Sequence, residues 1–338
     1  MKRTLLLVTG AGRSGTSTAA GAMALLGLHV PGPFLGANQS NPKGFYESKW
    51  SVEFHNRLLK RAAVSIADGR PDAQDRLLAA VRDADRAELR DTLQQVTESS
   101  RISALKDPRT TWTLPLWRDA ADDLGVRLAS LTMLRHPAEV LGSRATHYKS
   151  GLEELGEEGY AARNLAGWVN AMLMAERGTR GLTRSFVRYD DLLSDWRDAL
   201  SGPLTACGAP PPPAETHPVD EFIDPDLSRH RLTWADLSVP DELRAVADDV
   251  WSALSALADA RGADETQAAQ NVLDDARTRY DAIYDAARQL VHDAITGEAT
   301  LARRAGARAA RKLARNRPAD GSPAGSRVRS LARRVLRR

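Results

Sequence analysis

A short apolar run that leads directly into a glycine-rich loop constrains this chain more than any other feature. Residues 5–9, Leu-Leu-Leu-Val-Thr, have the unbroken apolar pattern of a strand that is buried on both faces. The glycine-rich segment 10–15 follows, and residues 16–26 then show helical spacing before Gly27. This order of strand, glycine loop and helix is the opening unit of an α/β fold with a parallel sheet.

Further strand and helix patterns alternate along the chain. Strands are predicted at 102–105, 127–134 and 185–189, and helices at 49–63, over most of 70–97, and at 139–148, 164–177 and 241–260. Residues 31–46 are rich in Pro, Gly and Asn and predict a long loop, which inside a compact domain is usually functional. We therefore expect a P-loop-like three-layer α/β fold, with a central parallel sheet flanked by helices.

The C-terminal region differs from the rest in charge. Residues 264–296 predict a long helix, and residues 301–338 carry thirteen Lys or Arg against one acid, Asp320. Because the net charge of the chain is +3, the tail's balance of +12 leaves −9 for the remainder. We expect a folded domain over 1–262, a helical C-terminal extension over 263–300, and a basic, partly disordered tail over 301–338.

The sequence also bears on compartment. The apolar run near the start is too short for an export signal, and no stretch of about twenty apolar residues could span a membrane. Cys207 is the sole cysteine, which excludes an internal disulfide and fits a reducing compartment. It lies between a predicted Gly202-Pro203 turn and a proline run, so we expect no chemistry from it. These features predict a cytoplasmic protein.

The glycine loop, residues 10–17, reads Gly-Ala-Gly-Arg-Ser-Gly-Thr-Ser. Its glycines allow several backbone N–H groups to face one anion, and the following helix adds its positive N-terminal end. The P-loop of nucleotide triphosphatases has the same glycine spacing but places Lys where this chain has Thr16. The cation lies inside the loop instead, at Arg13, where it can touch the bridging oxygen beside a 5′-phosphate.

At this point the chain resembles the sulfotransferases that use 3′-phosphoadenosine-5′-phosphosulfate (PAPS). Their donor loop reads P-K-S-G-T-T or P-R-S-G-T-T, and this sequence has Gly12, Arg13, Ser14, Gly15, Thr16 and Ser17. Their second signature holds the 3′-phosphate with an Arg and with a Ser eight residues later. Arg135 and Ser143 have that spacing here, at the end of a predicted strand and in the next helix.

Weaker resemblances extend over residues 4–235. Tyr189-Asp190-Asp191-Leu192 is similar to the family's Y-E-D-L, which implies that Tyr189 lies near the adenine. Segments 41–47 and 106–109 resemble parts of bacterial members and of tyrosylprotein sulfotransferases. The family's late R-K-G motif is absent, and Arg229, within the segment Ser-Arg-His-Arg at 228–231, is the candidate replacement.

The resemblance implies the catalytic roles. Arg13 would stabilise the leaving phosphate electrostatically, because Arg does not give up its proton. Glu47 would be the base that takes the acceptor's proton, and Lys106 would be a second cation on the sulfuryl group. Glu47 could instead serve only the N-terminus of the following helix, Lys106 could be a surface ion-pair residue, and His55 and His147 are rival bases. No His, Cys and acidic residues have metal-ligand spacing, so we expect no metal.

The acceptor and the partners are less constrained. The aromatic residues Phe34, Phe45, Tyr46, Trp50 and Trp168 could form a wall for a sugar or could be core, and we expect a carbohydrate hydroxyl as acceptor. The basic tail could be solvated or could bind an anionic membrane surface on the inner face. It lacks the aromatic residues and motifs of nucleic-acid binding. Two other classes stay open, namely a P-loop kinase of a small molecule and a non-catalytic membrane-associated protein.

Overall fold

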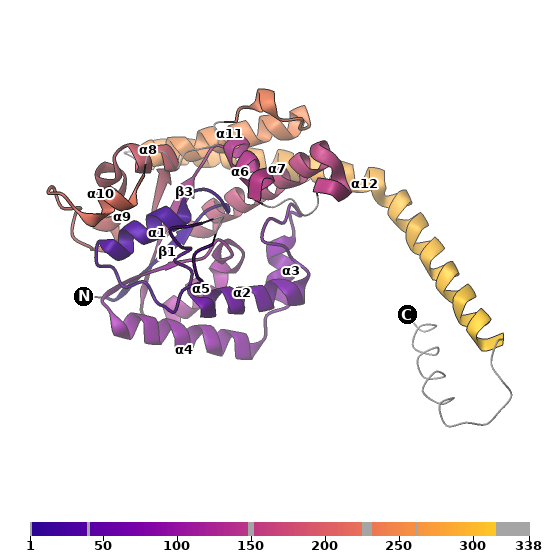
Figure 1. The fold of residues 1–338 in the computed structure, drawn as a ribbon, viewed down its shortest axis with the longest axis horizontal. Helices are drawn as coiled ribbons and strands as arrows, with labels where there is room; N and C mark the ends of the chain where they lie inside the picture. The colour runs from indigo at the N-terminus through magenta and orange to yellow at the C-terminus, as the bar shows by residue number, and fades with distance from the viewer. Residues whose placement is uncertain (1, 39–40, 148–151, 225–231, 261–262, 316–338) are drawn as a thin grey trace. The chain divides into compact units, whose positions relative to one another are not determined.

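A computed structural model describes residues 2–38, 41–147, 152–224, 232–260 and 263–315. The chain divides into two compact units, Met1–Asp281 and Ala282–Arg338. The first unit holds the sheet and nearly all of the helices (Figure 1).

The first unit is built on a sheet of four parallel strands in the order β2-β1-β3-β4. The strands are β1 (Thr4–Thr9), β2 (Ile102–Lys106), β3 (Arg127–Leu134) and β4 (Thr183–Arg188). The chain runs from β1 to β2 on one side and then to β3 on the other side of β1. This reversal creates a crevice beyond the carboxyl end of β1, which is where α/β sheets bind ligands.

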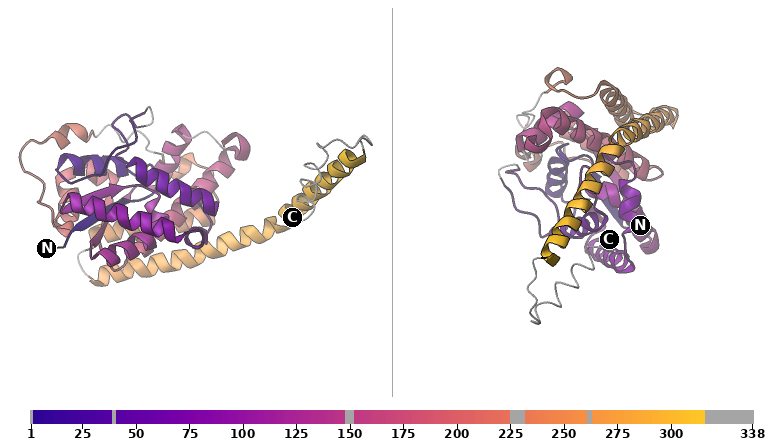
Figure 2. Two further views of the ribbon diagram at one scale, coloured as in Figure 1. Left: turned by 90° about the horizontal axis from the view of Figure 1, so that it is seen from below. Right: turned by 90° about the vertical axis from the view of Figure 1, so that its right-hand side faces the viewer.

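Helices cover both faces of the sheet (Figures 1 and 2). Those before β4 are α1 (Thr16–Leu25), α2 (Lys49–Ala62), α3 (Ala73–Ala79), α4 (Asp83–Ser99), α5 (Thr110–Leu124), α6 (Pro137–His147) and α7 (Leu152–Thr179). After β4 come α8 (Tyr189–Ser194), α9 (Trp196–Cys207), α10 (Pro218–Phe222), the 3₁₀ turn η2 (Trp234–Asp236), α11 (Asp241–Asp259) and α12 (Ala263–Arg315).

Alternate side chains of β1 enter two different cores, which explains why its sequence is apolar throughout. Leu5 and Leu7 join a cluster with residues of α2, α4 and α5, whereas Leu6 and Val8 join one with residues of α1, α8 and α9. The expected three-layer arrangement of a central parallel sheet between helices is confirmed.

Two of the helices that the sequence did not predict contain a proline. The predicted Gly202-Pro203 turn is wrong, because Pro203 lies inside α9 with Leu200, Leu204 and Cys207 buried on the same helix. Burial of this apolar face outweighs the local cost of the proline. Helix α5 also contains a proline, Pro115, and packs Trp112 and Trp117 into the core.

Helix α12 begins at Ala263 and belongs to both units. Within the first unit its apolar face is buried, and the Tyr280 hydroxyl donates to the carbonyl oxygens of Gly69 and Ala166. In the second unit Leu290 is 85% exposed and Leu301 is 64% exposed. Over the described ranges, no helix is both long enough and apolar enough to cross a membrane.

Candidate active site

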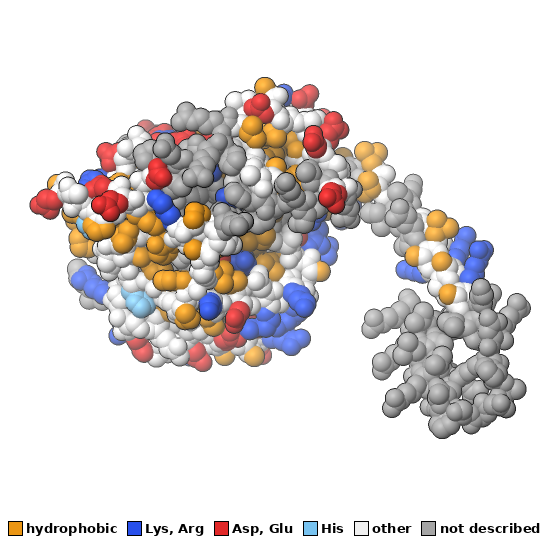
Figure 3. Space-filling view, viewed as in Figure 1, with side chains coloured by type: hydrophobic (Ala, Val, Ile, Leu, Met, Phe, Trp, Pro, Cys, Tyr) orange, Lys and Arg blue, Asp and Glu red, His pale blue; other side chains and the backbone are white. Residues whose placement is uncertain are grey.

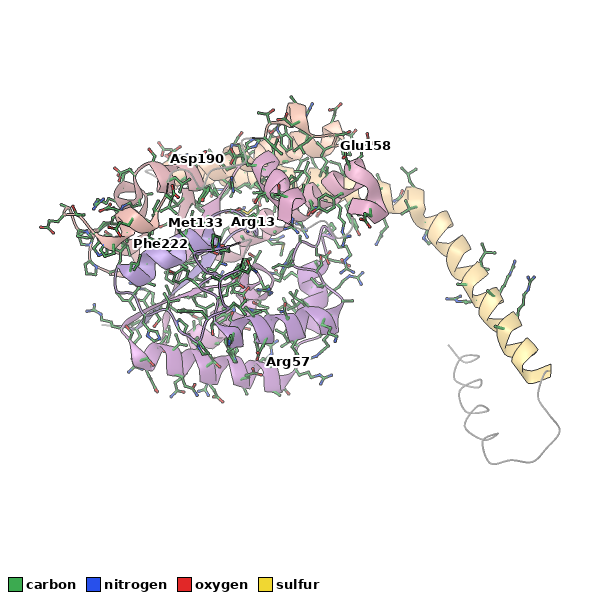
Figure 4. The ribbon with its side chains drawn as sticks, viewed as in Figure 1. Arg13, Arg57, Met133, Glu158, Asp190 and Phe222 are labelled. Atoms are coloured by element: carbon green, nitrogen blue, oxygen red, sulfur yellow. The ribbon has the colours of Figure 1, made fainter. Side chains whose placement is uncertain are left out.

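The carboxyl ends of all four strands contribute residues to one cavity of about 800 Å³. β1 leads into the glycine loop, β2 ends at Lys106, β3 is followed by Arg135, and β4 is followed by Tyr189. Helix α6 adds Ser143, and the long loop before α2 adds Glu47. Arg13 and Phe222 are two lining residues, and both lie in the band between the upper and lower helices in Figure 4.

The glycine loop has the backbone that an anion cradle requires. Gly10 and Gly15 adopt φ values of +129° and +86°, which disfavour any residue with a Cβ. A Cβ on Gly10 would lie 2.6 Å from the Met133 carbonyl oxygen, and a Cβ on Gly15 would lie 2.1 Å from the Tyr189 ring. Both glycines are therefore needed for the loop to fit between β3 and Tyr189.

Arg13, Arg135 and Ser143 meet at the edge of this loop. Arg13 Nε donates to Ser143 Oγ at 3.0 Å, and Arg135 Nη1 donates to the Arg13 carbonyl oxygen at 3.3 Å. The Arg135 guanidinium also lies 4.9 Å from the centre of the Tyr189 ring, and burial raises the pKa of Tyr189. The structure thus brings together residues that the sequence separates by more than 120 positions.

Two buried polar atoms of this cluster have no hydrogen-bond partner in the described part of the chain. They are Ser14 Oγ, on a residue that is 0% exposed, and Arg135 Nη2, on a residue that is 7% exposed. Buried polar groups are rarely left without a partner. A guanidinium N–H can donate to a phosphate oxygen, and Arg135, unlike Ser14, lines the cavity.

Glu47 directly precedes Ser48, the N-cap of α2, and its side chain lies between two cations. Its carboxylate accepts from Lys106 Nζ at 2.5 Å and from Arg109 Nη1 at 3.2 Å. Lys106 Nζ also donates to Ser17 Oγ at 3.1 Å, which links this pair to the glycine loop. Glu47 and Lys106 are only 5% and 3% exposed, so Lys106 is no surface ion-pair residue.

The rival base His55 lies away from the cavity. It is 0% exposed, and its Nδ1 lies 2.9 Å from Asp107 Oδ2. Burial acts to raise the pKa of Asp107, but the contacts with His55 and Arg109 outweigh it and hold that pKa well below its usual range. His147 ends α6, and its side chain lies outside the described residues, as does Arg229.

The aromatic residues proposed as an acceptor wall divide between core and cavity. Phe45 lines the cavity, Trp168 is 3% exposed and Trp50 packs against the core. Phe34 packs against Tyr46 with the two rings tilted by 52°, and Tyr46 contacts Phe222 edge-on at 5.8 Å between ring centres. The wall is therefore smaller than expected.

The cavity also contains residues that the sequence did not reveal. Phe222 lines it from α10, 176 positions after the end of the long loop, and no local pattern marks that approach. Among the described lining residues, the only acid is Glu47, and the seven cations are Arg13, Lys43, Lys106, Arg109, Arg135, Arg144 and Arg163. This imbalance favours a ligand with several negative charges. In the described segments, no group of three or more His, Cys, Asp or Glu could hold a metal ion.

The chain was compared with protein families, curated sequences and solved structures. Neither a protein-family model nor the sequence of a curated protein matches the chain. Two solved structures are similar. One is a sulfotransferase domain from an olefin synthase of Synechococcus PCC 7002, with 16% identity, a TM-score of 0.41, and coverage of 75% of this chain and 95% of that domain. The other is a sulfotransferase domain from the curacin biosynthetic pathway, with 15% identity, a TM-score of 0.41, and coverage of 75% and 98%.

We expect the free energy of unfolding to depend on pH because of the half-buried side chain of His136, which follows Arg135. Its ring contacts Trp234 and Trp251, and burial lowers its pKa against the opposing effect of Asp248, Glu139 and Asp190. The unfolded chain then binds the proton more readily, so the free energy of unfolding falls as pH drops below about 6.5. Chemical denaturation from about pH 7.5 to 5 should show this loss.

The control for this prediction is His136→Asn. The substitution keeps an acceptor for the Ala138 N–H, which bonds to His136 Nδ1 at 3.3 Å, but cannot titrate. In this variant the free energy of unfolding should change less between about pH 7.5 and 5. Identical curves for the two proteins would contradict the prediction.

Proposed function

We propose that this chain is a sulfotransferase that moves a sulfuryl group from PAPS to a hydroxyl. The observation that carries the proposal is Arg135, whose buried Nη2 has no partner in the described residues, and which is linked to Ser143 through Arg13 of the glycine loop. A nucleotide with phosphate at both the 5′ and the 3′ position would use the loop and this pair together. Position 16 holds Thr rather than the lysine of the P-loop, which favours such a donor over a nucleoside triphosphate.

In the proposed reaction the acceptor oxygen attacks the sulfur in line with the bond to the 5′-phosphate. That bond breaks, its electron pair leaves with 3′-phosphoadenosine-5′-phosphate (PAP), and the acceptor proton goes to Glu47. Arg13 and the loop N–H groups stabilise the charge on the leaving phosphate, and Lys106 turns from Glu47 toward the sulfuryl oxygens. Positioning and electrostatics supply most of the catalysis, as in phosphoryl transfer.

For the acceptor we propose a carbohydrate. The lining beyond the donor loop mixes the rings of Phe45 and Phe222 with the polar side chains of Asn38, Asn41 and Ser65. Rings can cover the apolar face of a sugar, and short polar groups can bond its hydroxyls.

Replacing Arg135 with Ala should weaken PAP binding about 100-fold, because two charge-assisted hydrogen bonds to the 3′-phosphate are lost. Binding of AMP, which lacks that phosphate, should change little. Calorimetric titration measures both. The matched control is Arg184→Ala, since Arg184 pairs with Glu176 much as Arg135 pairs with Glu139 through its Nε, but Arg184 lies outside the cavity lining. An equal loss in both variants would argue against a 3′-phosphate site.

For the second unit we propose that the basic tail binds anionic membrane surfaces. Arg303, Arg304 and Arg308 lie on the described part of α12, and Figure 3 shows Lys and Arg side chains on both sides of this segment. Each such residue gains about 1 kcal/mol near an acidic lipid surface. Flotation of the full chain with vesicles should show binding with phosphatidylserine at low salt and none with phosphatidylcholine. Binding to both alike would contradict the proposal.

A further inference from the structure

Asp107 follows Lys106 directly and lies at the centre of a buried hydrogen-bond network. It is 0% exposed. One of its oxygens, Oδ2, accepts from Ser51 Oγ at 2.8 Å and lies 2.9 Å from His55 Nδ1. The other, Oδ1, accepts from the Arg109 backbone N–H at 2.9 Å and from Arg109 Nη1 at 2.8 Å. The carboxylate therefore joins the core behind the cavity to a residue that lines it.

Trp117 determines the protonation state of His55. Its indole Nε1 donates to His55 Nε2 at 3.3 Å, and an indole N–H can only donate. His55 Nε2 must then accept, so the single ring proton lies on Nδ1 and points to Asp107. On this geometry the imidazole carries one proton, which it donates to Asp107, and the full positive charge beside that carboxylate is on Arg109.

Arg109 is consequently the counter-ion of Asp107. Its Nη1 also donates to Glu47 Oε2 at 3.2 Å, and its Nε donates to Asn56 Oδ1 at 2.9 Å. Three side chains thus hold the guanidinium, and its Nη1 contacts both the Asp107 and the Glu47 carboxylates. Because the distance to Asp107 is shorter and that pair is more deeply buried, most of its charge is already compensated there.

We propose that Asp107, with His55 fixed as the neutral Nδ1–H tautomer, is a positioning residue that holds Arg109 against Glu47 while balancing its charge. This inference rests on the proposed sulfuryl transfer, in which Glu47 accepts a proton. Asp107 compensates the positive charge of Arg109. Arg109 can therefore orient the Glu47 carboxylate by a hydrogen bond while doing little to keep that carboxylate from taking a proton. Lys106 is then the one described cation next to Glu47 that can turn to the sulfuryl group.

The competing explanation is that Asp107 forms an ordinary buried ion pair that only stabilises the fold. Asp85 offers a matched control for that explanation. It is 4% exposed and accepts from the Arg61 guanidinium and from the Arg82 backbone N–H, and it does not line the cavity. Asp107→Asn and Asp85→Asn therefore remove one carboxylate charge each from comparable surroundings.

The test combines nitrogen NMR of the full chain with a donor assay. In the wild type, the His55 ring should show a protonated Nδ1 and an unprotonated Nε2. The Arg109 guanidinium signals should be resolved in the wild type and in Asp85→Asn but averaged by rotation in Asp107→Asn. Conversion of PAPS to PAP with water as acceptor should fall about tenfold or more in Asp107→Asn, with PAP affinity within about twofold of wild type.

Three outcomes would overturn the positioning role. They are a doubly protonated His55, an Arg109 that stays fixed in Asp107→Asn, or a loss of turnover no larger than that in Asp85→Asn. Trp117→Phe gives a second variant in case Asp107→Asn does not fold. It removes the donor to His55 Nε2 together with part of a buried ring, so the ring proton should become free to exchange between the two nitrogens. PAP binding by the wild-type protein tests the proposed function separately. If the wild type does not bind PAP, the proposed function is wrong whatever the role of Asp107.

Discussion

Glu47→Gln should lower the turnover of the proposed sulfuryl transfer by about 10²- to 10⁴-fold, the range over which a positioned general base contributes. The amide has nearly the shape of the carboxylate but cannot take the acceptor's proton. PAP binding should be retained, because Glu47 lies beside Lys106 and Arg109 rather than against the residues assigned to the two phosphates. The measurement is single-turnover loss of PAPS in the presence of an acceptor.

The matched control for this substitution is Glu88→Gln. Glu88 accepts from Trp50 Nε1 and pairs with Arg57 outside the cavity lining, so its loss should leave the rate unchanged. A near-normal rate in Glu47→Gln would assign the base to another group. His55 is poorly placed for that role, since it is 0% exposed and both of its ring nitrogens are engaged.

Gly15→Ala should abolish measurable PAP binding and destabilise the first unit by about 3 kcal/mol. Two effects combine in this estimate. The residue has a φ of +86°, and the added Cβ would lie 2.1 Å from Tyr189 Cδ2. The Tyr189 ring is 6% exposed and lies under Arg135, so it cannot move away without disturbing that guanidinium.

A double substitution separates the two effects. Adding Tyr189→Ala to Gly15→Ala removes the clash but not the unfavourable φ, so the two changes should be less than additive in the free energy of unfolding. Gly12→Ala serves as the control within the loop, because a Cβ there has only an ordinary contact of 3.8 Å with Arg144. Wild-type donor binding in Gly15→Ala would show that the loop is not the phosphate site.

The parts of the site that the sequence predicted are local or have a fixed spacing. The glycine loop is marked by a strand before it and a helix after it, and both formed as expected. Arg135 lies just before α6 and Ser143 lies within it, and both bond to Arg13 of the glycine loop. Parallel strands end at the same edge of a sheet, which explains why Lys106 and Tyr189 also reach the cavity.

The parts that were missed depend on contacts between distant segments. Asp107 bonds to residues more than 50 positions away, and nothing in a Lys-Asp-Pro-Arg segment identifies His55 and Trp117 as its surroundings. The course of α9 through Pro203 was missed because local preference predicts a turn, whereas burial of Leu200 and Leu204 favours a helix. In both places the structure depends on packing between distant segments, which local sequence preferences do not reveal.

Titration of the wild-type chain with PAP and with AMP tests the central claim most directly. If the loop holds the 5′-phosphate and Arg135 with Ser143 holds the 3′-phosphate, PAP should bind with a micromolar dissociation constant and AMP about 100-fold more weakly. Equal affinity for the two nucleotides, or no binding of either, would contradict the assignment of this cavity to a PAPS-dependent sulfotransferase.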